Sequence, residues 1–278
     1  MRYRPILPVL AGALAAVHVL GILTGVPLLR QAEVAALLLL TAYALTARRP
    51  GRSWALPVAL TALVVEAWIM MPADPADRGW QVLRPGAVDP TLGFVTGLRL
   101  SWAALLLVLI LLLTGLRRDA RPGRFALAGA VLAATLVVGY AAVRLAEIHF
   151  AVSESGRSGP GDTSPSGAAA VGAMLAPLAL AVGALVLAVL LAGRRRRVAA
   201  GGAVLLALVA LTHLDTALTA LALPRYAERG VLLSAAFQAN ASLPASGPAV
   251  FAAVELAAYL LLVVGLVGRH PPRVEPVS

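Results

Sequence analysis

Eight long apolar stretches, separated by short polar connections, limit what this chain can fold into. Each stretch has about the 20 residues that a helix needs to cross the hydrocarbon core of a bilayer. Because a helix satisfies its own backbone hydrogen bonds in lipid, the pattern predicts an all-α bundle of about eight transmembrane helices. We expect one domain over residues 1–278, with spans at residues 5–28, 31–47, 53–72, 94–116, 125–149, 168–192, 199–222 and 249–268.

The composition supports a membrane protein and excludes several kinds of chemistry. Hydrophobic residues make up 60% of the chain and charged residues 13%, against about 45–50% and 25% in soluble domains. There is no cysteine, and all 23 basic residues are arginine, which excludes disulfides, thiolate metal sites and lysine Schiff bases. The bias toward Ala, Arg, Gly and Pro is typical of a bacterium with a GC-rich genome, so we expect the cytoplasmic membrane of a bacterium.

The arginines alternate between the two sides of the predicted bundle. One side has 15 arginines and two acids, whereas the other has six arginines and seven acids. The positive-inside rule therefore places both termini in the cytoplasm. It also explains the net charge of +10 without nucleic acid as a partner.

The predicted outer connections are longer than the inner ones. The Gly/Ser/Pro-rich residues 153–167 predict a flexible loop, and Val231–Ala239 resembles a short interfacial helix. Residues 269–278 form a predicted cytoplasmic tail. The similarity between residues 10–21 and 127–139 predicts two parallel repeats of four spans.

Ionisable residues inside the spans fall almost entirely in the predicted outer half. The seventh span contains His213 and Asp215, although a charge at this depth costs roughly 3 kcal/mol. Glu66, Arg99 and Glu255 lie at a comparable depth in their spans. We therefore predict a polar cluster that opens outward, in which His213 and Asp215 face different neighbours because they are two residues apart on a helix.

Soft metal ligands are the first interpretation of this cluster. Imidazole and thioether groups suit Cu(I), and four residues have compatible depths: His18, Met70, Met174 and His213. Two alternatives stay open from the residues alone. His18 and His213 could be the axial ligands of a haem, or they could be single polar residues that hydrogen-bond between helices.

Proton exchange is the second interpretation. Glu66, Asp215 and Glu255 could take up and release protons in the low-dielectric interior, with Arg99 as a counter-ion. A static salt bridge between Arg99 and Glu66 is the structural alternative. Near the outer end of the fifth span, Arg144 and Glu147 are three residues apart and predict a local ion pair.

The layout resembles one known family. Eight spans with both termini inside, and the first-span segment His18-Val-Leu-Gly21, are similar to the copper-resistance protein D family of bacterial membrane proteins. The resemblance implies copper handling at the membrane. Since no catalytic motif is present, we expect no enzyme but a protein that handles or transports a small solute, with copper as the first candidate cofactor or cargo. The alternative is an accessory or assembly subunit whose buried charges contact a membrane partner or a second copy.

Overall fold

The computed structural model describes residues 6–46, 54–70, 91–115, 123–155, 166–220 and 246–268. Every regular element within these ranges is an α-helix, as predicted, and none of them contains a strand. The helices are α1 (Ile6–Thr24), α2 (Pro27–Arg30), α3 (Ala32–Thr46), α4 (Ala55–Ile69), α5 (Thr91–Gly115), α6 (Arg124–Ser155), α7 (Ser166–Gly193), α8 (Arg197–Thr219) and α10 (Ser246–Val267).

Seven helical segments are long and apolar enough to cross a membrane, which indicates a membrane protein. One of the seven combines α2 and α3 into the segment Pro27–Thr46. The helix α4 is not among them, because its 15 residues span about 22 Å, less than the roughly 30 Å of a hydrocarbon core. Helices occupy all eight predicted stretches. The exact number of crossings, their orientation and the internal repeat stay predictions.

The first two predicted spans form a tight hairpin because the backbone turns at two residues between them. Gly25 has a φ of +70°, which glycine adopts without steric cost, and Pro27 begins α2. As a result α1 ends at Thr24, earlier than the predicted residue 28. At Gly21 an added Cβ would lie 2.7 Å from the Cβ of Leu29, so glycine allows α2 to fold closely against α1.

One predicted loop is partly helical. The helix α6 continues to Ser155 and α7 begins at Ser166, so the prediction of a loop over 153–167 is wrong at both of its ends. In α6 and α7, the helical hydrogen bonding extends beyond the apolar residues from which the spans were predicted. The interfacial helix predicted at Val231–Ala239 and the tail at 269–278 lie outside the described residues.

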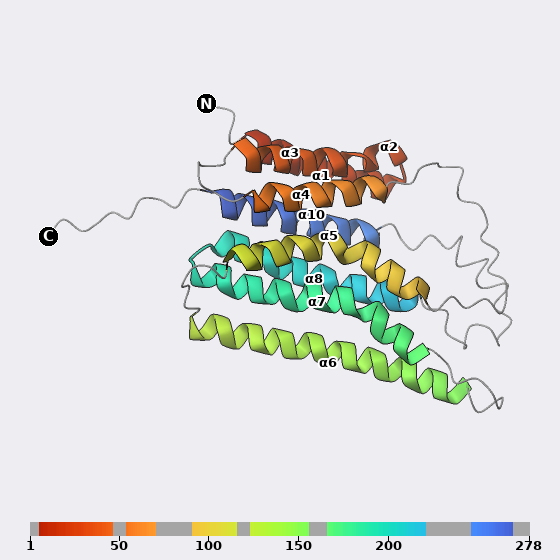
Figure 1. The fold of residues 1–278 in the computed structure, drawn as a ribbon. Helices are drawn as coiled ribbons and strands as arrows, with labels where there is room; N and C mark the ends of the chain where they lie inside the picture. Colours follow the sequence, from red (N-terminus) through yellow and green to blue (C-terminus); the bar gives the residue numbers. More distant parts are fainter. Residues whose placement is uncertain are drawn as a thin grey trace.

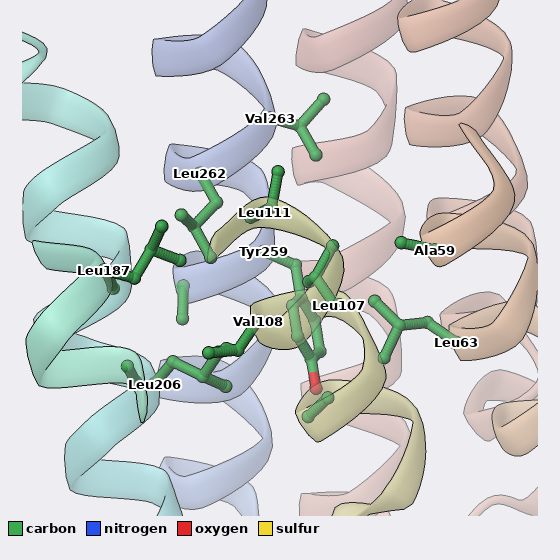
Figure 2. Packing of buried hydrophobic residues seen from close by; sticks show 14 of the residues in the cluster. Ala59, Leu63, Leu107, Val108, Leu111, Leu187, Leu206, Tyr259, Leu262 and Val263 are labelled. Carbon is green, nitrogen blue, oxygen red and sulfur yellow. The ribbon is translucent and has the colours of Figure 1, made fainter. Parts of the chain in front are cut away.

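The helices lie side by side with their axes roughly aligned, and α6 lies at one edge (Figure 1). Contacts join α7 to α5, α6 and α8, and α10 to α8, α1 and α3. The largest apolar core is built between α1, α3, α4, α5, α7, α8 and α10, and Figure 2 shows part of it around Tyr259 and Leu107. A second, smaller cluster joins α6 to α7 and α8.

Candidate functional site

Seven polar residues from six helices form two contacting groups and one buried carboxyl group, and we call them the polar network. Their helices are α1, α3, α4, α5, α8 and α10. We call the end of the bundle at which α1, α4 and α8 terminate the site end (Figure 1). The polar network comprises His18, Glu33, Glu66, Ser101, His213, Glu255 and Tyr259.

His18 connects the hairpin to the network. Its ring is buried, and Nδ1 lies 2.8 Å from the carbonyl oxygen of Arg30. A carbonyl oxygen only accepts hydrogen bonds, so Nδ1 carries the hydrogen. The other nitrogen, Nε2, lies 3.6 Å from Oε2 of Glu33, which is in the first turn of α3. The His18–Glu33 pair is therefore favourable only when one further proton is present, on the imidazole or on the carboxyl group.

His213 forms a second arm of the network with residues of α5 and α10. Its Nδ1 lies 3.4 Å from Oγ of Ser101, and Nε2 lies 3.9 Å from Oε2 of Glu255. The hydroxyl of Tyr259, one helical turn after Glu255, donates to Oε1 of that carboxylate at 2.9 Å. Ser101 and Tyr259 are buried, so this arm continues from α5 through α8 into α10.

Glu66, on α4, interacts electrostatically with one carboxylate of each arm and differs from the other members. Its Oε1 is buried and has no hydrogen-bond partner within the described residues. The charges of Glu255 and Glu33 both act on this carboxyl group. Three carboxylates that repel one another in a low-dielectric interior are costly unless a cation or protons accompany them.

The structure gives the four predicted copper ligands different surroundings. The two histidines contact the partners described above. Met174 is buried in the smaller apolar cluster beside α6, whereas Met70 follows the end of α4 and is 41% exposed. Within the described ranges, no three His, Asp or Glu side chains form a group that could hold a metal ion. The copper and haem interpretations stay predictions.

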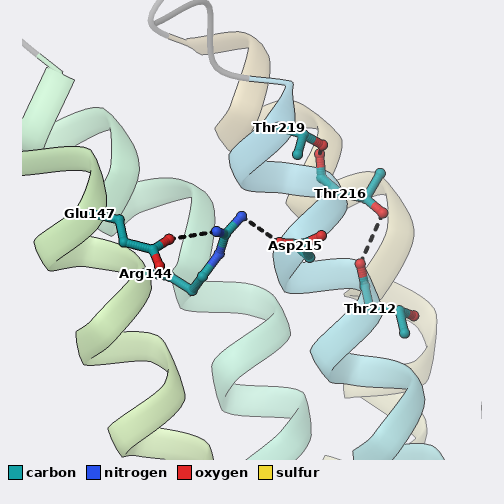
Figure 3. A network of polar contacts seen from close by, with 6 residues as sticks. All are labelled: Arg144, Glu147, Thr212, Asp215, Thr216 and Thr219. Atoms are coloured by element: carbon teal, nitrogen blue, oxygen red, sulfur yellow. Dashed lines mark hydrogen bonds and ion pairs between the residues drawn. The ribbon is translucent and has the colours of Figure 1, made fainter. Parts of the chain in front are cut away.

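Asp215 does not belong to the polar network, contrary to expectation. Its Oδ1 accepts a 2.6 Å hydrogen bond from Nη2 of Arg144 on α6 (Figure 3). The predicted local pair is confirmed, because Nη1 of Arg144 lies 2.6 Å from Oε2 of Glu147. His213 and Asp215 indeed face different neighbours, since the helix directs one toward α10 and the other toward α6. We call Arg144, Glu147 and Asp215 the edge triad.

Arg99 also lies apart from the carboxylates. It is exposed on α5 and forms no ion pair with any residue that the structure describes. The expected salt bridge with Glu66 is therefore absent among these residues. The nearby interior position on α5 is occupied by Ser101 instead, two residues further along and hence on a different face of the helix.

Three members of the network were missed in the sequence. Glu33 was counted with the outer connections, because the predicted second span began only two residues before it. Tyr259 follows Glu255 by four residues, a spacing that places both on one helix face and could have revealed the pair. Ser101 has no comparable signal, since its role depends on α8 lying against α5.

Comparison of the chain with protein-family models, with curated proteins and with solved structures gives no match. The resemblance to the copper-resistance protein D family therefore stays a hypothesis.

Proposed function

We propose that this membrane protein handles a small cationic solute at the polar network and exchanges protons there. The orphaned Oε1 of Glu66, between the charges of Glu33 and Glu255, carries the proposal. A proton or a small cation would relieve the repulsion between the three carboxylates. The sequence contains no nucleotide-binding motif, so transport would be secondary or would need a partner.

The position of the network supports access from one side of the membrane. Glu66 lies three residues before the end of α4, and Glu33 is the second residue of α3. Along the helix axis, Glu66 therefore lies about 5 Å from the end of α4, and Glu33 lies about 9 Å from Pro27, where the segment of α2 and α3 begins at the same end of the bundle. With the predicted topology, that end faces outward. A solute could reach these groups from the outer side without crossing the apolar inner half.

Infrared spectroscopy tests the protonation part of the proposal without knowledge of the solute. At neutral pH we expect the C=O stretch of a protonated carboxylic acid in the reconstituted protein, and its loss in Glu66→Gln. The matched control is Glu147→Gln, which removes an exposed carboxylate from the edge triad. The proposal fails if the wild-type protein has no such band, because all three network carboxylates would then be ionised.

Proteoliposomes that contain a pH-sensitive dye test which cation binds at the polar network. Copper(I), zinc(II) and sodium are added in turn, and the cation that binds should release protons in the wild-type protein. Glu66→Gln should abolish the release, and His18→Ala and His213→Ala should reduce it. Copper is the first metal to test because of the family resemblance. Unchanged copper binding in both histidine variants would exclude these residues as ligands.

An accessory or assembly role is the second candidate, and α6 is the observation that favours it. This helix has 32 residues, yet it packs mainly on α7, and large apolar side chains such as Leu136 and Val143 are more than half exposed. Lipid would cover such a surface equally well. Native mass spectrometry after extraction in a mild detergent distinguishes the two, since a partner or second copy adds a fixed protein mass.

A further inference from the structure

The connection between α7 and α8 consists of arginines in a strained turn. The amide of Arg196 donates to the carbonyl of Leu191, and that of Arg195 donates to Ala192, which is the Schellman arrangement that ends many helices. This arrangement needs a residue with positive φ, and Arg195 takes it with a φ of 58°. Glycine fits such a position better than any L-residue with a side chain. The backbone conformation therefore does not favour arginine here, and we infer that its charge does.

Two of the guanidinium groups in this turn are available to a ligand. Arg196 is engaged, because its Nη1 donates to the carbonyl oxygen of Leu266 near the end of α10 at 2.5 Å. Arg195 and Arg197 are exposed, and neither forms an ion pair with a described residue. The turn joins two helices that are apolar enough to span a membrane, which places both charges near the bilayer surface.

An exposed apolar stripe continues from these charges along α8. Arg197, Gly201, Val204 and Leu208 follow at the spacing of one helix face and are all exposed. Nothing lies within 4 Å of a Cβ placed on Gly201, so the helix surface is open there. Val204 and Leu208 are 44% and 52% exposed. A charged head above an open apolar stripe matches the shape and polarity of one phospholipid.

We propose that this surface binds an anionic phospholipid, with its phosphate at Arg195 and Arg197 and an acyl chain along Gly201, Val204 and Leu208. Anionic headgroups attract basic residues at the membrane surface, at about 1 kcal/mol for each arginine. The site lies at the opposite end of the bundle from the polar network. The two proposals can therefore fail independently.

Native mass spectrometry of the full chain in detergent, titrated with phosphatidylglycerol or phosphatidylcholine, tests the proposal. We expect preferential binding of phosphatidylglycerol, weakened roughly fivefold by Arg195→Gln or Arg197→Gln. The matched control is Arg124→Gln, which removes an exposed arginine from the start of α6 at the same end of the bundle, and it should bind as the wild-type protein does.

Arg195→Gly separates lipid binding from folding. Glycine accepts the positive φ, so this variant should unfold at a higher temperature while it binds phosphatidylglycerol more weakly. Wild-type lipid affinity in Arg195→Gly would overturn the proposal, as would equal binding of the two lipids. Displacement of the lipid by inorganic phosphate at an equal concentration would also overturn it, because the stripe on α8 would then contribute nothing.

Discussion

The polar network and the edge triad both place ionisable groups among apolar helices, and each contains a buried atom without a hydrogen-bond partner within the described residues, but they differ in the length of their ionic contacts. In the edge triad, Arg144 makes two contacts of 2.6 Å, to Glu147 and Asp215, and all three side chains are partly exposed. In the polar network the ionic contacts are 3.6 Å and 3.9 Å long, and a buried oxygen of Glu66 has no partner within the described residues.

This difference is why we propose a functional role for the polar network and a structural role for the edge triad. In the edge triad, the single guanidinium group of Arg144 contacts two carboxylates and links α6 to α8, which leaves one negative charge in excess. The network contains three carboxylates and no arginine, which costs more stability and favours the binding of a cation. Four experiments on stability test this contrast.

The close approach of α8 and α10, two helices that carry network residues, should be the contact most sensitive to substitution. A Cβ on Gly202 would lie 2.7 Å from the carbonyl oxygen of Ala258 and from the amide nitrogen of Leu262. Gly202→Ala must therefore separate the helices that carry His213 and Glu255, at a cost of about 1–3 kcal/mol. Thermal unfolding in detergent measures it. The neighbouring Gly201→Ala has open space and should instead stabilise by up to about 1 kcal/mol; equal effects would contradict this packing.

The hydroxyl of Tyr259 should matter less than the helix contact. Tyr259→Phe removes the hydrogen bond to Oε1 of Glu255 and should reduce the free energy of unfolding by about 1 kcal/mol. Tyr43→Phe is the control, because the hydroxyl of Tyr43 has no hydrogen bond within the described part of the chain. If Tyr259→Phe stabilised the protein, Glu255 would not accept this bond.

The ion pair between α6 and α8 should be weaker still, since both side chains are partly exposed. In a double-mutant cycle with Arg144→Gln and Asp215→Asn, we expect a coupling free energy of about 0.2–1 kcal/mol that falls with added salt. Chemical unfolding of the four proteins measures it. A coupling well above 2 kcal/mol would mean that the edge triad is as strongly desolvated as a buried pair, and the contrast between the two regions would disappear.

Glu147 should contribute least to stability. It is the more exposed partner of Arg144, three residues along the same helix, and such pairs contribute about 0.2–0.5 kcal/mol. Glu147→Gln should therefore change the unfolding free energy by only a few tenths of a kcal/mol, measured in the same titrations. A loss near that of Tyr259→Phe would show that Glu147 positions Arg144 for Asp215.

The helices and the contacts between residues close in sequence could be predicted, because the length of an apolar stretch and the spacing of residues are read directly from the sequence. The helices, the local pair Arg144–Glu147 and the opposite directions of His213 and Asp215 all depend on residues near one another in the chain. The concentration of ionisable residues in one half of the bundle was also visible, since depth follows from the rise of 1.5 Å per residue.

The partners of the polar residues were decided only by the tertiary structure. Rotation of each helix about its axis depends on close packing between helices, such as that of Gly202 against Ala258, and no spacing within a single span encodes it. The rotation of each helix about its axis, and which helices pack together, determine that Asp215 contacts Arg144, that Arg99 is exposed and that Glu33 lies beside His18. The sequence therefore determined which costly groups enter the membrane, and helix packing determined which of them meet.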